Sequence, residues 1–272
     1  EVAAPTSSST PLPDPAPEHE APVEAGTPAA LQDTQVAVAA TASPGASDTP
    51  RLPTAHPPGN VDLTYDVSIS AKGLRYNAEA QLTWRLSAGG YSGEMDISAF
   101  LLGSRVQTSR GQVGPAGLIP ERFSDRRRSN EKAAHFDHTG QRIRYSSNAP
   151  DTPLLPGAQD RLSIFLQLSA LLQTHPEAYP QGQTIALQVV GTGGAEVWQF
   201  QVGPLEDIQL PAGSLNTRRL TRTPRREFDS TVEVWLAPAL QFLPVRIRVT
   251  EHNGDVADQQ LRKLPKPPQL IQ

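Results

Sequence analysis

Residues 159–173 read QDRLSIFLQLSALLQ, and this is the only long stretch of the chain whose apolar residues follow the spacing of a helix. The apolar side chains cover most of the circumference, and small or polar residues leave one narrow stripe. A helix that is apolar nearly all round is buried. The apolar residues are Leu162, Ile164, Phe165, Leu166, Leu168, Leu171 and Leu172, and the stripe holds Ser163, Gln167, Ala170 and Thr174.

The ends of this helix are marked by residues that start and stop helices. Gly157 precedes it as a breaker, and the side chain of Asp160 can accept hydrogen bonds from the unpaired N–H groups of a first turn. Pro176 prevents the helix from continuing past His175. We therefore predict one buried helix over residues 159–174, which plugs a curved sheet.

The first 60 residues differ in composition from the rest of the chain. They hold 12 of the 27 prolines and are otherwise rich in Ala, Ser and Thr, so they cannot bury enough apolar surface to offset the entropy lost on ordering. Seven acids and one base give this part a charge of 1 − 7 = −6, whereas 23 bases and 21 acids give the remainder +2. We predict a disordered, acidic Pro/Ala-rich linker over residues 1–59, a β domain over residues 60–264 and a tail over residues 265–272. The near-neutral domain gives no electrostatic case for nucleic acid as a partner.

The chain has no cysteine, which removes disulfides, zinc–thiolate sites and thiol nucleophiles together. No stretch approaches the ~18 consecutive apolar residues of a membrane span. The sequence begins at Glu1 without a methionine, and the acidic linker follows at once. We expect that a signal peptide or a membrane anchor was removed, and that the protein is exported to the periplasm and held near the inner membrane, with the linker as a spacer.

Strict alternation of apolar and polar residues begins at Val61 and continues, after a turn at Lys72-Gly73, through residues 74–86. Gly89-Gly90 and Asn253-Gly254 are typical of tight turns between strands. We predict further strands at residues 91–99, 105–112, 118–124, 132–137, 141–146, 184–190, 196–202, 205–210, 214–221, 231–236, 245–251 and 256–261.

About a dozen strands with tight connections indicate an antiparallel meander. Each strand is half polar, which excludes a parallel sheet covered by helices on both faces. Sheets of this size twist and curl. The predicted fold is therefore mainly β: a large curved antiparallel meander sheet, half-barrel or barrel-like, wrapped around one buried helix and preceded by the linker.

Several separated motifs resemble domain-of-unknown-function family 3108 of proteobacterial envelope proteins. The motifs are Pro156-Gly157-Ala158-Gln159-Asp160-Arg161-Leu162-Ser163, Pro211-Ala212-Gly213 before Leu215, and Trp235-Leu236-Ala237-Pro238 followed by Leu243-Pro244-Val245-Arg246-Ile247. The resemblance covers roughly residues 60 to 262. It implies an exported protein, similar in expected shape to curved-sheet envelope carriers such as the lipoprotein chaperones. No catalytic residues are established for that family, so the resemblance transfers none, and the N-terminal linker is not part of the family pattern.

The candidate ligand-binding residues gather on the predicted helix and on the inward faces of strands. Aromatic side chains there either line an apolar cavity or fill the core. At the mouth of the helix, an acid beside an arginine forms either a polar anchor for a ligand or a helix cap with a surface neighbour. The candidates are Trp84, Asp160, Arg161, Phe165, Trp198 and Trp235.

A group of arginines near residue 220 is the candidate for contact with anionic headgroups. Arginine side chains grip phosphate and carboxylate with two hydrogen bonds at once. The alternative is a solvated loop whose charge is balanced by Glu227 and Asp229. The candidate residues are Arg218, Arg222, Arg225 and Arg226.

Other sites receive little support from the sequence. His135, Asp137 and His138 share a hairpin, but a transition-metal site needs three or four convergent ligands with supporting contacts. Glu79 and Glu94 are the carboxylates that a glycan hydrolase would use, yet nothing around them distinguishes them as a pair. We name no catalytic residue, metal or cofactor.

Three functions are compatible with this pattern. The first is a non-enzymatic envelope protein that binds an apolar ligand, a lipid or a lipidated segment, between sheet and helix, with lipid or a lipoprotein as its partner. The second is a structural or assembly factor that interacts with other envelope proteins through its sheet or its proline-rich arm. The third is a glycan hydrolase. A continuous apolar cavity would favour the first, and a filled core with an exposed edge strand or groove would favour the second.

Overall fold

The computed structural model describes residues 52–99 and 103–266. Their strands are β1 (Val61–Ala71), β2 (Leu74–Ser87), β3 (Gly90–Ala99), β4 (Gly103–Gly114), β5 (Gly117–Arg127), β6 (Asn130–Asp137), β7 (Arg142–Tyr145), β8 (Thr152–Pro153), β9 (Gln159–Asp160), β10 (Thr184–Val190), β11 (Ala195–Leu210), β12 (Gly213–Arg222), β13 (Thr231–Ala237), β14 (Leu243–Thr250) and β15 (Val256–Leu261). The helix is α1 (Ser163–Thr174), and two short 3₁₀ turns are η1 (Pro176–Ala178) and η2 (Pro238–Leu240).

All fifteen described strands belong to one sheet. The sheet follows the chain outward from β1 to β8 on one side, and from β15 back to β9 on the other, so the first and last long strands pair in its middle. Neighbouring strands are antiparallel except β9 and β10, which are parallel. The predicted mainly β, curved meander wrapped around one helix is confirmed, and the parallel β9–β10 pair is an addition to it.

The alternation seen in the sequence accounts for the strands. Leu63, Tyr65 and Val67 of β1 are buried, and the residues between them face outward or are only partly covered. The turn between β1 and β2 has positive φ at both central residues, 51° at Lys72 and 76° at Gly73. That combination is typical of the two-residue turns whose twist matches antiparallel strands.

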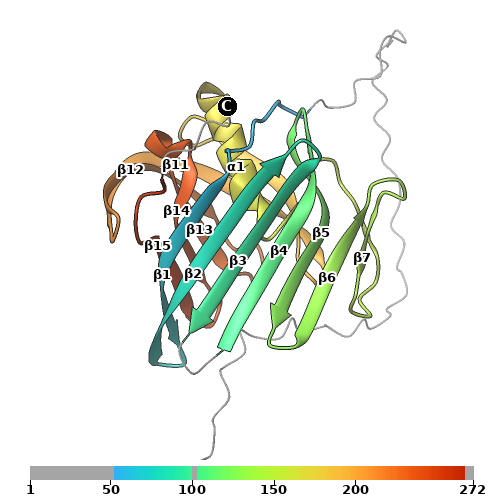
Figure 1. The fold of residues 1–272 in the computed structure, drawn as a ribbon, viewed down its shortest axis with the longest axis horizontal. Helices are drawn as coiled ribbons and strands as arrows, with labels where there is room; N and C mark the ends of the chain where they lie inside the picture. The colour runs from blue at the N-terminus through green and yellow to red at the C-terminus, as the bar shows by residue number, and fades with distance from the viewer. Residues whose placement is uncertain (1–51, 100–102, 267–272) are drawn as a thin grey trace, which may run out of the picture. The chain divides into compact units, whose positions relative to one another are not determined.

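The helix lies inside the curve of the sheet, as Figure 1 shows. Nine of its twelve residues are buried. Leu162 and Leu166 belong to a core cluster whose residues come mainly from β1–β7, with others from β10, β11 and β13–β15. Ile164 and Leu168 belong to a second cluster, with residues of β10–β14. One helix therefore contributes to both halves of the core, as expected for a helix that is apolar nearly all round.

The helix begins four residues later than predicted. Gln159 and Asp160 form the short strand β9, which pairs with Val189 and Val190 of β10, and the helix starts at Ser163. Residues from Leu52 onward pack against the domain, ahead of its predicted start at residue 60. Residues 1–51 of the predicted linker and 267–272 of the predicted tail lie outside the described residues.

The structure has one strand where the sequence predicts two. The predicted strands 196–202 and 205–210 are both part of β11, which continues through an irregularity between Val202 and Leu205. Gly203-Pro204 interrupts the alternation at that point. A β-bulge accommodates such an interruption without ending the strand.

The two edges of the sheet, β8 and β9, are joined by a short loop and held by the side chain of Gln188 in β10. Its Oε1 accepts a hydrogen bond from the N–H of Leu155 at 2.9 Å, and its Nε2 donates to the carbonyl of Pro153 at 2.9 Å. Ser147 adds a hydrogen bond to the carbonyl of Thr192, at 3.2 Å. A buried amide side chain thus takes the place of strand pairing at this seam.

Candidate functional site

Asp160 lies at the point where β9 leads into the helix, and it is fully buried. Its Oδ1 accepts hydrogen bonds from the backbone N–H groups of Leu162 and Ser163, at 2.9 and 2.8 Å. The hydroxyl of Ser109 in β4 donates to Oδ2 at 2.5 Å, and Tyr91 Oη lies 3.0 Å from the same hydroxyl oxygen. The predicted acceptance of unpaired helix N–H groups by Asp160 is confirmed.

Burial raises the pKa of Asp160 to about 6, although the hydrogen bonds from Ser109 and from the backbone of Ser163 and Leu162 act in the opposite direction. Burial also raises the pKa of Tyr91, and the charge of Asp160 acts in the same sense. These groups connect the start of α1 to β3 and β4. Asp160 is not exposed to solvent, so a substrate cannot reach its carboxylate.

Arg161 is exposed beside this cluster, and its guanidinium lies over Gly191. A Cβ atom at Gly191 would lie 3.1 Å from Nε of Arg161, so glycine leaves the room that this side chain occupies. The predicted pair Asp160-Arg161 is therefore divided between the interior and the surface.

The aromatic candidates are not brought together. Trp84 is buried against Tyr91, with ring centroids 5.0 Å apart, and Phe165 of the helix is partly buried between the two core clusters. Trp198 packs with Phe200 in the other half of the core, at 5.9 Å. These three side chains contribute to packing within the described interior.

Trp235 is 4% exposed and belongs to the core cluster that also contains Leu162 and Leu166. It is paired with Arg246, whose guanidinium lies 4.6 Å from the centre of its ring. Its Nε1 donates to Glu206 at 2.7 Å. The neighbouring residues Val234 and Leu236 belong to the other core cluster, with Ile164 and Leu168. Trp235 thus packs in the core through its ring and reaches an acid through its N–H.

An apolar pocket of about 100 Å³ lies between the helix and β10. Leu171 of α1 and Ile185 and Leu187 of β10 contribute the apolar side chains, and Leu52 and Pro53 cover one side. The amide of Gln167 at its margin is already hydrogen bonded to Leu118 N and Ala116 O. The full lining is Leu52, Pro53, Ala116, Gly157, Gln167, Leu171, Tyr179, Ile185, Ala186 and Leu187.

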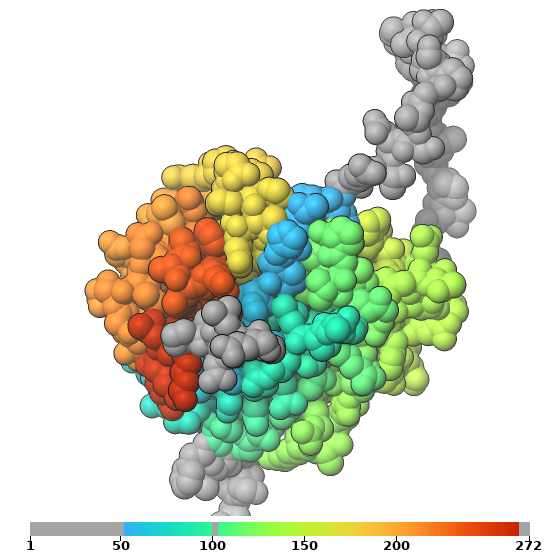
Figure 2. Space-filling model, turned by 45° about the horizontal axis from the view of Figure 1, so that its top comes forward, coloured from blue at the N-terminus to red at the C-terminus, as the bar shows by residue number. Residues whose placement is uncertain are grey.

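Residues 52–58, here called the strap, run between the helix and the β4–β5 turn. Figure 2 shows this blue segment between the yellow segment, which includes α1, and the green strands. Ala55 is 1% exposed, its N–H donates to the carbonyl of Pro115 at 3.0 Å, and the N–H of His56 donates to Thr174 Oγ1 at 2.8 Å. The indole of Trp84 donates to the carbonyl of Pro58 at 3.0 Å. The strap was not predicted, and the signal in the sequence is the three-residue spacing of Leu52, Ala55 and Pro58.

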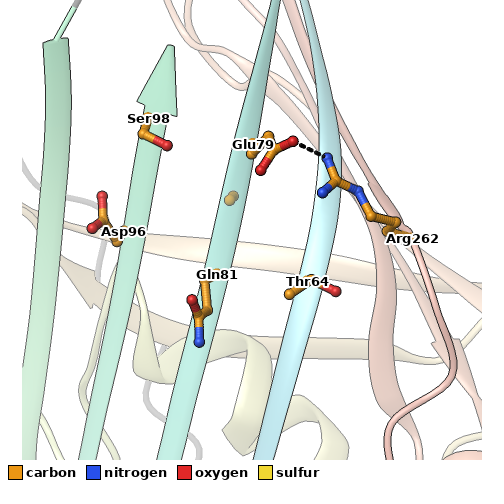
Figure 3. A pocket seen from close by; sticks show the side chains of 7 residues that line it. Thr64, Glu79, Gln81, Asp96, Ser98 and Arg262 are labelled. Carbon is orange, nitrogen blue, oxygen red and sulfur yellow. Dashed lines mark ion pairs between the residues drawn. The ribbon is translucent and has the colours of Figure 1, made fainter. Parts of the chain in front are cut away.

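A second pocket, of about 110 Å³, lies among the polar residues of β1–β3 and is drawn in Figure 3. Glu79 and Arg262 form an ion pair of 2.7 Å across it, and Arg262 also pairs with Asp66 at 2.5 Å. The hydrogen bond and charge of Arg262 lower the pKa of Glu79. Glu94, the other candidate carboxylate, is exposed on the neighbouring strand β3 and does not line this pocket.

The structure separates the four candidate arginines into different environments. Arg222 is 3% exposed, and its guanidinium lies 3.1 Å from both Glu196 and Asp229 and 5.0 Å from the ring centre of Trp198. Arg218 donates to the carbonyl of Gly203 at 3.0 Å. Arg225 and Arg226 lie in the exposed β12–β13 loop. Contact with a headgroup requires an exposed guanidinium group, and of these four arginines only Arg225 and Arg226 are exposed.

The histidine hairpin has ordinary hydrogen-bond partners. His138 Nε2 lies 2.7 Å from the carbonyl of Pro120, and Asp137 accepts from the N–H of Gly140 at 2.7 Å and pairs with Arg142 and Arg144. Within residues 52–99 and 103–266, no three histidine, cysteine or acidic side chains are grouped so that they could hold a metal ion. None of the helices in these ranges has the length and apolarity needed to cross a bilayer.

The chain resembles known proteins in sequence and in fold. The crystal structure of a beta-barrel-like protein of domain of unknown function DUF1849 from Brucella abortus is similar with a TM-score of 0.49 and 10% identity, over 78% of this chain and 98% of that one. A comparison with curated proteins gives no match. The family model described as "Protein of unknown function (DUF3108)" matches residues 60–261, which confirms the resemblance seen in the separated motifs. The chain belongs to the DUF3108 family.

Proposed function

We propose that this domain is a non-enzymatic binding protein of the cell envelope, and that an apolar ligand, such as a lipid or a lipidated segment, enters the pocket between α1 and β10. The observation that carries the proposal is the apolar lining of that pocket, at a place where the strap and not the sheet covers the helix. Leu52 is 41% exposed at its margin, so an apolar surface continues outward from the pocket.

The size of the pocket limits what it can hold. At about 100 Å³ it is smaller than the roughly 300–1,000 Å³ typical of sites that enclose a whole small molecule. The ligand therefore inserts one apolar end, such as the terminus of an acyl chain or one side chain, and the remainder lies against the surface near Leu52.

A dansyl-labelled fatty acid tests this proposal on the full chain. Ala186 is exposed in β10 and lines the pocket, so Ala186→Arg would place a long charged side chain at its mouth. We expect the dissociation constant to rise by about tenfold or more, equivalent to ~1.4 kcal/mol. Thr184→Arg, on the same strand and outside the lining, is the matched control and should bind as the wild type does. Absence of binding by the wild type, or equal loss in both variants, would remove the proposal.

The envelope location is supported by the composition of the N-terminal segment, which is rich in proline and acidic residues, as a spacer would be. The proposal that the protein is not an enzyme is supported by the surroundings of Glu79, a candidate catalytic carboxylate. Arg262 keeps Glu79 in its ionised form, which is the opposite of what a general acid needs. Fractionation of cells that express the full-length protein with a C-terminal tag tests the location directly, and recovery in the cytoplasm would contradict it.

A second candidate is an assembly factor that binds a segment of another envelope protein. The observation that favours it is the strap, because an extended, proline-containing segment already occupies a groove beside the helix.

A further inference from the structure

The strap turns one face toward the domain, at intervals of three residues. Leu52 lies against Gly157, where a Cβ atom would be 3.2 Å from Leu52 Cδ1, and Ala55 and Pro58 are both buried. His56 and Gly59, which lie between or beyond them, are exposed. A repeat of three is the period of the polyproline II helix, which has no internal hydrogen bonds and leaves its backbone groups free to bind elsewhere.

The groove supplies partners for those backbone groups. It donates one hydrogen bond, from the indole of Trp84 to the carbonyl of Pro58, and accepts two, at the carbonyl of Pro115 and the hydroxyl of Thr174. An indole N–H directed at a carbonyl beside a proline is the chemistry by which aromatic grooves recognise proline-rich segments. The side-chain pocket at position 55 is small, because Ala55 is already 1% exposed.

The groove and the strap differ in their relation to the family. Trp84, Pro115 and Thr174 lie within the matched residues 60–261, whereas the strap lies before them. The strap also adds no strand to the sheet. The groove is thus part of the family domain, and its occupant in this chain comes from outside the matched region.

We infer that the groove between α1, the β4–β5 turn and Trp84 is a recognition site for an extended, proline-containing segment of a partner protein, and that the strap occupies it in cis. The pattern that fits is an apolar residue, a small residue three positions later and proline three positions after that. The inference does not rest on the apolar-ligand proposal, because the segment is held through its main chain and needs no lipid.

The experiment uses the full chain and a fluorescein-labelled peptide with the sequence of residues 49–60. Ala55→Arg in the protein would expel the strap, because a buried position without space receives a long cation. We expect this variant to bind the peptide at least about tenfold more tightly than the wild type, in which the strap competes at an effective concentration on the order of millimolar. Fluorescence polarisation measures both constants.

Matched controls separate recognition from general destabilisation. His56→Arg in the protein changes an exposed side chain next to Ala55, so the strap should stay bound and peptide binding should stay as weak as in the wild type. A peptide that itself carries Ala55→Arg should bind to neither protein. Equal binding of the two peptides, or no binding by an Ala55→Arg protein with an unchanged circular dichroism spectrum, would overturn the inference.

The wild type offers a second measurement if Ala55→Arg does not fold. An excess of unlabelled peptide should displace the strap and increase the hydrogen exchange of the Ala55 and His56 amides, which are protected by their hydrogen bonds to Pro115 and Thr174. Exchange that is unchanged at millimolar peptide would likewise overturn the inference. Neither measurement involves a lipid, so failure here leaves the apolar-ligand proposal to its own test.

Discussion

Asp160 shows how a single buried carboxylate can organise the entry to a helix. It receives two backbone N–H groups and the hydroxyl of Ser109, so the start of α1 is fixed to β4 through one side chain. Burial nevertheless raises its pKa to about 6, since desolvation outweighs these hydrogen bonds. The residue is therefore sensitive to pH at values close to neutrality.

This gives a prediction for Asp160→Asn. A pKa raised from 3.8 to about 6 means that the folded state holds the proton more tightly than the unfolded chain, so the stability from this group is present below pH 4 and is lost as the pH rises through 6. The variant has no such loss. We expect its free energy of unfolding, relative to the wild type, to increase by ~2 kcal/mol between pH 4 and pH 7. Urea unfolding across this range measures it, and a difference that does not vary with pH would contradict it.

Gln167 provides a second prediction. Its amide acts as both donor and acceptor toward the β4–β5 turn, through the carbonyl of Ala116 and the N–H of Leu118. Gln167→Leu leaves both backbone groups without partners, and we expect a loss of about 2–4 kcal/mol in thermal or urea unfolding. Gln173→Leu is the control on the same helix, because Gln173 Oε1 has no hydrogen-bond partner. A control that costs as much as Gln167→Leu would show that the turn contacts contribute little.

A sequence pattern predicts whether a side chain is buried only where burial follows from local spacing, as in an alternating strand. Arg222 and Arg225 are three positions apart and chemically identical, yet one is buried between two acids and the other is exposed. No local signal separates them, because the acids that bury Arg222 come from β11 and from the β12–β13 loop. Trp235 is a related case: its burial is predictable from its large apolar ring, whereas its stacking on Arg246 and its hydrogen bond to Glu206 depend on β14 and β11.

At the scale of elements, the long strands were predictable because their alternation persists over many residues. The strand Val256–Leu261 and the strand Thr184–Val190 have the predicted ends. The two-residue strands β8 and β9 are too short to show any period, and their position depends on contacts with β7 and β10. The strap escaped prediction because its composition matches that of the residues before it.

The seam between the sheet edges gives an element-scale prediction. Gln188→Leu removes both hydrogen bonds to the loop that joins β8 to β9. We expect faster hydrogen exchange at Leu155 and in β7, since this loop then opens without the rest of the sheet. Gln199→Leu, exposed on the adjacent strand β11, is the control and should leave the exchange unchanged. If the Leu155 amide exchanged as slowly in Gln188→Leu as in the wild type, contacts other than those of Gln188 would hold this loop in place.

At the scale of the whole molecule, two half-sheets meet at the β1–β15 pair and share one helix. Tyr65 of β1 donates its hydroxyl hydrogen to the carbonyl of Pro244 in β14, at 2.8 Å, which adds a contact between the halves. Because α1 packs against both, neither half keeps its core when the other unfolds. The described domain should therefore behave as one cooperative unit.

Two single-tryptophan variants test this cooperativity. One keeps Trp84, in the half that contains β2, and the other keeps Trp198, in the half that contains β11; phenylalanine replaces the remaining tryptophans. We expect the fluorescence midpoint of each variant in urea to coincide with its own circular dichroism midpoint. A fluorescence transition that precedes the loss of β structure in either variant would indicate that the halves unfold separately.

The pairing of the first long strand with the last has a consequence for synthesis. Until residues 256–261 have emerged, one side of β1 lacks its partner, and an eleven-residue edge with an apolar face is open to any neighbouring chain. The outward carboxylates of Asp62 and Asp66 place charge along that edge during this interval. A nascent chain therefore carries its greatest risk of aggregation until its final strand arrives, and truncation before residue 256 makes that vulnerable intermediate permanent.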